Sequence, residues 1–181
     1  KEESAKVIEA AIRKAAKKPT GELTKADLEK VTRLILYNKQ LTSVKGLEKL
    51  TQLEVLLLDD NQLTDVPKEL EKLTKLKSLI LFRKQLTSVK GLEKLTKLTN
   101  LSLQSNKLTK LPEGLEKLDQ LTGLYISNNQ LTDVKGLENL TQLESLSLSG
   151  NQLTDVKGLE KLTQLTYLVL LDNKLTDVKG L

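Results

Sequence analysis

The chain has 181 residues, of which 38% are hydrophobic and 29% are charged, enough for one domain with a sizeable core. It contains no Cys and no His, which excludes disulfides, thiolate chemistry and the most common general base. Residues 1–40 hold ten Lys/Arg against six Asp/Glu, so they carry +4 of the net charge of +5. The remainder has no basic stripe and no run of 18 apolar residues, so we expect no nucleic-acid partner and no membrane span.

The N-terminal segment predicts a helix over residues 2–18, because it is rich in Ala and has acidic residues first and basic residues last. Its expected apolar stripe consists of Ala5, Ile8, Ile12 and Ala15. Residues 19–21 (Pro-Thr-Gly) end this helix, and Thr24 with Asp27 predicts a capping box for a second, shorter helix. We interpret residues 1–30 as a helical cap that shields the first repeat, rather than as a membrane-surface or partner helix.

From residue 31 onward the chain repeats one template, L-x-x-L-x-L-x-x-N-x-L. The template begins at Val31, Leu53, Leu76, Leu98, Leu121, Leu143 and Leu165. Units of 22 residues contain L-T-[SD]-V-K-G-L-E-[KN]-L, whereas units of 23 residues contain Pro67 or Pro112 in L-T-x-[VL]-P-x-x-L-E-K-L. The Leu residues at template positions 1, 4, 6 and 11 point to one interior that only stacked coils can bury. Residues 31–181 therefore predict one repeat array, folded together with the cap.

The shorter unit resembles the 22-residue repeats of the internalin family of bacterial surface proteins. The longer unit, with its L-P-x-x-L, is similar to 23-residue leucine-rich repeats of animals, plants and bacteria. This resemblance implies an α/β fold class and a right-handed leucine-rich repeat solenoid, curved as an arc. It also implies parallel strands on the concave face and 3-10 or irregular turns on the convex face. Natural members of the family mostly recognise ligands.

The ninth template position is occupied by Asn61, Asn106, Asn129, Asn151 and Asn173. An Asn side chain both donates and accepts, so we expect it to satisfy turn backbone groups that no sheet pairs. Lys39 and Lys84 occupy this position in two near-duplicate segments, and Lys cannot accept a hydrogen bond. Two interpretations stay open. Either the turn reshapes and the Lys points to solvent, or the module was chosen to change curvature or to bind a ligand.

Template positions 3, 5, 7 and 8 are expected to face the concave side, with an apolar cluster in the N-terminal half and another near the C-terminus. The candidate binding surface consists of Arg33, Ile35, Tyr37, Val55, Leu57, Asp59, Ile80, Phe82, Arg83, Tyr125, Tyr167, Val169 and Leu171. This layout predicts contact with a protein or peptide, or self-association. The alternatives are that these residues reflect strand propensity or were inherited with the modules. Leu175, Val178 and Leu181 also predict an open apolar end that supports dimerisation.

No group of side chains predicts catalysis, a cofactor or a metal site. Asp59 and Asp60 are adjacent strand-end carboxylates that ordinarily face water, and Asp172 lies several coils away. The linkers repeat almost unchanged and Met and Trp are also absent, which is typical of consensus or computational design. We therefore interpret the chain as an engineered scaffold of defined curvature, recombinant, soluble and without a natural compartment, with a binding or assembly role on its concave face. The alternative is a natural internalin-like recognition domain regularised to consensus.

Overall fold

The computed structural model describes residues 2–82, 85–179 and 181. Helices α1 (Glu2–Ala16) and α2 (Lys25–Glu29) precede an alternation of short strands and 3-10 helices. The strands are β1 (Arg33–Ile35), β2 (Val55–Leu57), β3 (Ser78–Ile80), β4 (Asn100–Ser102), β5 (Gly123–Tyr125), β6 (Ser145–Ser147) and β7 (Tyr167–Val169). The 3-10 helices are η1 (Leu47–Lys49), η2 (Lys68–Lys72), η3 (Leu92–Lys94), η4 (Leu115–Lys117), η5 (Leu137–Asn139) and η6 (Leu159–Lys161).

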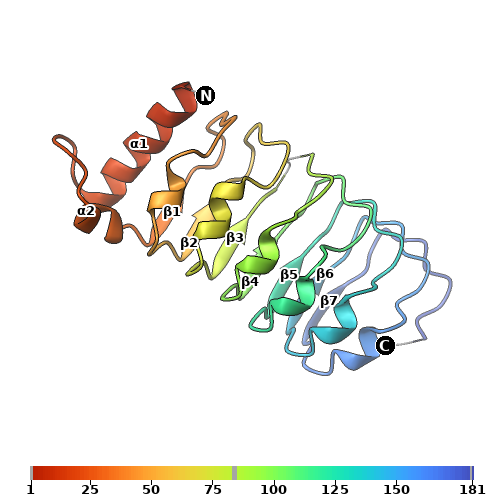
Figure 1. Cartoon of the computed structure of the whole chain (residues 1–181). Coiled ribbons are helices and arrows are strands. Elements are labelled where there is room, and N and C mark those ends of the chain that lie inside the picture. The colour runs from red at the N-terminus through yellow and green to blue at the C-terminus, as the bar shows by residue number, and fades with distance from the viewer. Residues whose placement is uncertain (1, 83–84, 180) are drawn as a thin grey trace.

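All these strands pair in parallel in the order β1-β2-β3-β4-β5-β6-β7, so each strand pairs only with the repeats before and after it. Figure 1 shows the resulting stack, with the 3-10 helices on the side opposite the sheet. The predicted right-handed solenoid, with strands on its concave face and 3-10 turns on its convex face, is confirmed. We number the coils 1 to 7 from the template starts at Val31, Leu53, Leu76, Leu98, Leu121, Leu143 and Leu165.

The core is a set of leucine columns that run the length of the array. Pairing joins Leu56 to Leu79 and Leu79 to Leu101, so the same template position of successive coils lies side by side. Each of these side chains is 0% exposed. Burying a Leu side chain stabilises a fold by about 1.5–3 kcal/mol relative to leaving it in water, and no coil can bury its leucines without its neighbours.

A glycine and a glutamate form the turn in each convex linker of the 22-residue units. In the 22-residue units the glycine before the 3-10 helix has a left-handed backbone, as at Gly136 (φ 104°), which favours a residue without a Cβ. The glutamate two residues later accepts a hydrogen bond from that glycine's N–H, at 2.7 Å between Gly136 and Glu138. Glu48, Glu93 and Glu160 make the same contact at 2.6–2.8 Å. The N–H groups of Glu138 and Gly136 lower the pKa of the Glu138 carboxyl.

The cap packs on coil 1 through a helix face that shares Ile8 and Ile12 with the predicted stripe but differs at its two ends. The residues that α1 buries are Ser4, Ile8, Ile12 and Ala16. Ala5 and Ala15 are exposed, so the prediction was wrong at both ends of the stripe. Ser4 has a specific reason to face inward, because its Oγ accepts a hydrogen bond from the Thr42 N–H at 3.1 Å.

The predicted capping box of α2 is confirmed. The Asp27 N–H donates to Thr24 Oγ1 at 3.2 Å, and the Thr24 N–H donates to Asp27 Oδ2 at 3.0 Å. Lys18 Nζ also donates to Asp27 Oδ2, at 2.8 Å. The hydrogen bond from Lys18, followed by those from Thr24, holds the pKa of the Asp27 carboxyl far below its usual value.

Candidate functional site

The ninth-position asparagine ties each coil to the coil before it. Asn129 Oδ1 accepts from the Leu108 N–H of the preceding coil at 3.0 Å. Its Nδ2 donates to the carbonyl oxygen of Leu103, also in the preceding coil, at 3.0 Å, and to that of Ile126 in its own coil at 3.3 Å. Asn61, Asn106, Asn151 and Asn173 repeat this pattern. The expectation that these side chains satisfy turn backbone is confirmed, although their reach to the preceding coil was not predicted.

Of the two lysines at this position, the structure describes only Lys39. Lys84 and Arg83 lie outside the described residues. Lys39 is exposed, and the residue after it, Gln40, has a left-handed backbone (φ 55°). Gln85 is left-handed in the same way (φ 57°), whereas in the coils with an asparagine at the ninth position the residue directly after it is not left-handed. At Lys39 the structure therefore agrees with the first interpretation, in which the turn reshapes and the side chain points to solvent.

The apolar side chains of coils 1 to 3 meet on the concave side of the sheet. Strand pairing places Ile35 beside Leu57 and Leu57 beside Ile80, so these three form one row. We call the whole group the N-terminal patch, and it consists of Ile35, Tyr37, Val55, Leu57, Ile80 and Phe82. Ile35 is 43% exposed and Tyr37 is 55% exposed, while the other four members are half-buried.

Charged groups border this patch. Arg33 pairs with Val55 in the sheet and is exposed. Asp59 is half-buried and belongs to coil 2, between Tyr37 of coil 1 and Phe82 of coil 3. Its carbonyl oxygen accepts a hydrogen bond from the Asn38 N–H at 3.0 Å. The structure thus brings together the predicted site residues of coils 1 to 3 that it describes.

The remaining predicted site residues lie apart from the N-terminal patch. Tyr167, Val169 and Leu171 form a C-terminal patch on coil 7, in which Tyr167 is 56% exposed and Leu171 is 71% exposed. Tyr125 belongs to neither patch. Its ring lies over Gly123, where an added Cβ would stand 3.2 Å from the Tyr125 hydroxyl, and that hydroxyl donates to Ser145 Oγ at 3.0 Å.

Small polar side chains separate the two patches. Ser127 Oγ lies 2.6 Å from Ser147 Oγ and accepts from Ser149 Oγ at 3.1 Å. Ser102 Oγ is buried, and no hydrogen-bond partner for it exists among the described residues. Coils 4 to 6 carry no charged residue at template positions 3, 5, 7 or 8. The middle of the concave face is therefore an uncharged, largely polar surface between two apolar patches.

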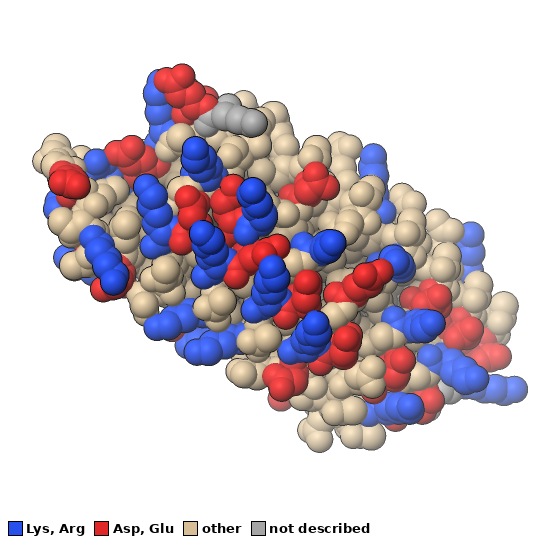
Figure 2. Space-filling model, in the orientation of Figure 1, with Lys and Arg blue, Asp and Glu red and all other residues tan. Residues whose placement is uncertain are grey.

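The concave face holds all the aromatic residues of the chain. The sequence has three Tyr, one Phe and no Trp, and they are Tyr37, Phe82, Tyr125 and Tyr167. On the face that carries the 3-10 helices, Lys and Arg side chains intermix with Asp and Glu along the whole array (Figure 2). The two faces thus differ in chemistry: one carries charged side chains of both signs throughout, and the other carries all the aromatic residues, in apolar patches with few charged residues beside them.

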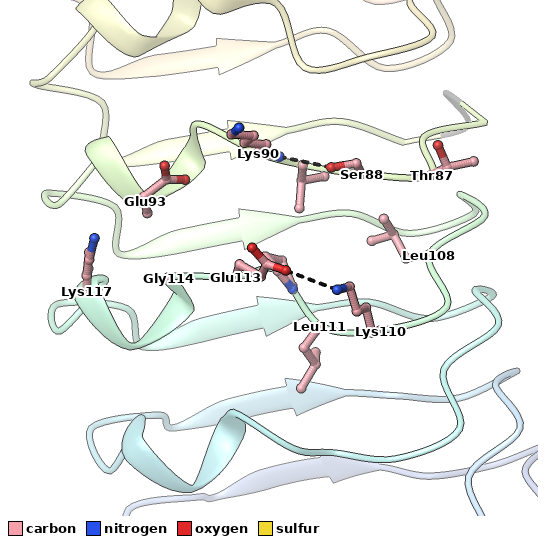
Figure 3. Close-up of a pocket in the computed structure, with 12 residues that line it drawn as sticks. Thr87, Ser88, Lys90, Glu93, Leu108, Lys110, Leu111, Glu113, Gly114 and Lys117 are labelled. Atoms are coloured by element: carbon pink, nitrogen blue, oxygen red, sulfur yellow. Dashed lines mark hydrogen bonds and ion pairs between the residues drawn. The ribbon is translucent and has the colours of Figure 1, made fainter.

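A groove of about 350 Å³ on the convex side was not predicted. It lies between the linkers of coils 3 and 4, where a 22-residue unit lies beside a 23-residue unit. Figure 3 shows Lys90 and Glu93 on one linker and Lys110 and Glu113 on the next. Lys110 Nζ lies 3.0 Å from Glu113 Oε1, and this contact lowers the pKa of the Glu113 carboxyl. The alternation of linker lengths in the sequence was the feature from which this groove could have been predicted.

The groove continues the mixed charge of the convex face and contains no aromatic anchor. In the part of the chain that the structure describes, no three His, Cys, Asp or Glu side chains are placed to hold a metal ion. None of the described helices has the length and apolar character needed to cross a membrane.

Comparisons with known proteins agree with this geometry. The family model "Leucine Rich repeats (2 copies)" matches residues 51–94, 96–139, 119–156 and 141–181. The structure is similar to that of internalin C2 from Listeria monocytogenes, with 30% identity and a TM-score of 0.77, over 96% of this chain and 87% of that one. It is also similar to an internalin (inlF) from the same organism, with 30% identity and a TM-score of 0.76. That match covers 96% of this chain and 58% of the other, and the comparison with curated proteins found no match.

The repeat sequence and the overall fold are thus similar to those of proteins of one family. The match to the family model covers well over half of the chain. The chain belongs to the leucine-rich repeat family, with an internalin-like array, and its fold is that of a repeat protein with a role in protein interaction.

Proposed function

We propose that the chain recognises a protein or peptide through the N-terminal patch. The observation that carries this proposal is that Tyr37 and Phe82, two of the four aromatic residues of the chain, lie in one patch with four aliphatic side chains of coils 1 to 3. Aromatic and Arg side chains are the residue types enriched at interface hot spots, and Tyr37, Phe82 and Arg33 lie in or beside the patch. The row of Ile35, Leu57 and Ile80 supplies apolar area next to them.

Strand propensity alone accounts less well for this pattern. The same template positions in coils 4 and 6 hold Asn100, Ser102, Ser145 and Ser147, and these coils form equally regular strands. Apolar side chains at the positions of the patch are therefore not needed for the coil to fold. Exposed apolar side chains grouped on one face mark contact surfaces more often than isolated ones do.

A random peptide library displayed on phage tests the proposal, with the full chain as immobilised target. The test variant changes Leu57, Ile80 and Phe82 to Ser. The matched control changes Tyr167, Val169 and Leu171 to Ser in the C-terminal patch. Urea denaturation establishes that both variants are folded before use.

Peptides selected on the wild-type chain should bind the control equally well and bind the test variant at least about tenfold more weakly, which corresponds to about 1.4 kcal/mol. Equal binding to all three proteins, or no enrichment of any peptide, contradicts the proposal. Sedimentation velocity over a range of concentrations distinguishes peptide binding from self-association of the chain through the same patch. In that case the wild-type chain associates and the test variant does not.

We also propose that the chain is an engineered, non-catalytic scaffold in which mixed 22- and 23-residue modules set the curvature. The near-identical linkers and the repeated glycine–glutamate contact support this origin over a regularised natural domain. If the modules are interchangeable, a variant without residues 131–152 keeps the phase of the template and folds cooperatively. Circular dichroism during urea denaturation checks this, and a broad or absent transition contradicts modular construction.

A further inference from the structure

We propose that the N-terminal cap and coil 1 form a binding site for a medium-chain fatty acid, whose carboxylate takes the place that Glu71 holds against coil 3. The site is a groove of about 420 Å³ between α1, α2 and the linker of coil 1 that contains η1, and we call it the cap groove. It contains no residue of the N-terminal patch, so this proposal does not depend on the proposed function.

The cap groove has an apolar lining. Ile8 and Ile12 of α1 contribute to it, and they are only 2% and 5% exposed. Leu23 and Leu28 also line the groove, and both are half-buried against the core. A surface of this kind binds an alkyl chain by removing apolar area from water, and the gain grows with each methylene.

Two lysines of coil 1 give the groove its positive charge. Lys45 and Lys49 both line it, and both are exposed. In the described part of the chain, neither ammonium group has a hydrogen bond or an ion pair. An alkyl chain that ends in an anion can therefore place its apolar part on the isoleucines and leucines and its charge beside these lysines.

The carboxylates that line the groove are already engaged. Glu9 Oε1 lies 2.8 Å from Arg13 Nη2, and Arg13 is not part of the lining. Glu48 Oε2 accepts a hydrogen bond from the Gly46 N–H at 2.6 Å. Because the charge of Glu9 is balanced from outside, the groove sets two lysines against one carboxylate, and this imbalance favours an anionic ligand.

Coil 3 shows which partner such a lysine takes. Lys49 and Lys94 occupy the same place in two identical linkers, which read S-V-K-G-L-E-K in coils 1 and 3. Lys94 Nζ donates to Glu71 Oε2 of the preceding coil, and this hydrogen bond raises the pKa of Lys94. Coil 1 follows the cap instead of another coil, and no described carboxylate of the cap lies within ion-pair distance of Lys49.

The linker glycines show the same difference as open space. An added Cβ at Gly91 of coil 3 would stand 2.9 Å from Glu71 Oε1. One at Gly158 of coil 6 would stand 3.7 Å from Cβ of Glu138 in the coil before it. At Gly46, which lines the cap groove, an added Cβ would meet no atom within 4 Å. The position that a glutamate takes in coils 3 and 6 is therefore open to the carboxylate of a ligand in coil 1.

An NMR titration of the full, ¹⁵N-labelled chain with sodium octanoate tests the site. The amides of Ile12 and Gly46 should shift saturably, with a dissociation constant of about 1 mM or lower. Acetate at the same concentrations should not shift them, because it has no alkyl chain to bury. From butyrate through hexanoate to octanoate, each added methylene should tighten binding by about two- to fourfold.

Lysine variants separate the charge from the apolar contact. The double variant Lys45→Gln, Lys49→Gln should weaken octanoate binding by about fivefold or more and leave the binding of neutral 1-octanol unchanged. The matched control, Lys157→Gln with Lys161→Gln, changes the same two positions in coil 6, which has no helical cap beside it. This control should bind octanoate like the wild-type chain.

Absence of saturable shifts at Ile12 and Gly46 overturns the site. Equal affinity for acetate and octanoate contradicts the role of the apolar lining. Unchanged octanoate binding by the Lys45 and Lys49 variant, or an equal loss of 1-octanol binding, contradicts the placement of the carboxylate. Equal weakening by the coil 6 control shows that the positive charge of the whole chain, and not the cap groove, attracts the anion. None of these results bears on peptide binding by the N-terminal patch.

Discussion

The ladder asparagine in the middle of the array offers the sharpest test of what holds the coils together. Asn129 is 7% exposed and bonds to Leu108, Leu103 and Ile126 at 3.0, 3.0 and 3.3 Å. The change Asn129→Ala leaves the buried Leu108 N–H without a partner, and an unsatisfied buried donor costs about 1–3 kcal/mol. The loss of Nδ2 also removes a donor from three carbonyls, those of Leu103, Ile126 and Ser127. We expect the free energy of unfolding to fall by about 3 kcal/mol in total.

Urea denaturation followed by circular dichroism at 25 °C measures this change, provided that the slope of the unfolding free energy with urea stays constant. Asn139→Ala is the control, because Asn139 is exposed on η5 and should change stability by less than about 0.5 kcal/mol. Asn173→Ala should cost less than Asn129→Ala, because Asn173 is only half-buried and water reaches its partners. A loss below about 1 kcal/mol for Asn129→Ala would show that the ladder does not stabilise the stack.

Three further changes test local features. The folded-state pKa of Asp27 lies below its unfolded value, so its contacts stabilise the fold above about pH 4 and are lost as the pH falls. The difference in unfolding free energy between wild type and Asp27→Asn should therefore shrink between pH 6 and pH 2. Gly136→Ala should lower the unfolding free energy by about 1–3 kcal/mol through backbone strain alone, because the added Cβ meets no atom within 4 Å. Gln85→Gly should raise it by about 0.5–1 kcal/mol, because the residue is left-handed.

Each of these changes has a result that contradicts it. A stability difference for Asp27→Asn that stays constant down to pH 2 would show that the carboxylate contacts are not made in solution. Thermal denaturation in a series of buffers measures this difference. An unchanged urea midpoint for Gly136→Ala, or a lower one for Gln85→Gly, would show that the backbone at those turns differs from the one described.

The coil architecture could be predicted from the sequence because its determinants are periodic. A Leu at a given template position points the same way in every coil, so the strands, the core columns and the concave rows all follow from spacing. The partners of each side chain do not follow from spacing. The asparagines could be assigned to turn backbone, but their bonds to Leu103 and Leu108 of the preceding coil depend on how far the coils are offset.

In the N-terminal cap, too, the partner of a side chain could not be predicted from spacing. Ala5 and Ser4 are both small, so hydrophobicity alone favours Ala5 as the inward residue of α1. The structure buries Ser4 because Thr42, 38 residues away, provides a partner for its hydroxyl. The convex groove was missed for a similar reason, because it arises from the fit between two linkers of different length. The two apolar clusters of the candidate surface follow from the sequence, whereas the hydrogen bond from Tyr125 to Ser145, in the stretch between them, does not.

The stacked glutamates of the convex linkers show what identical repeats impose on a solenoid. Equivalent residues of neighbouring coils lie next to each other, so a residue that recurs in every unit brings like charges together along one column. Glu138 and Glu160 lie in neighbouring coils in this way, whereas Glu48 and Glu93 belong to coils 1 and 3. Each is held by a backbone N–H of its own linker, which disperses part of its negative charge at its source. Repetition therefore sets like charges side by side wherever two 22-residue units are neighbours, while the glycine N–H and nearby lysines stabilise each carboxylate, as at Glu138.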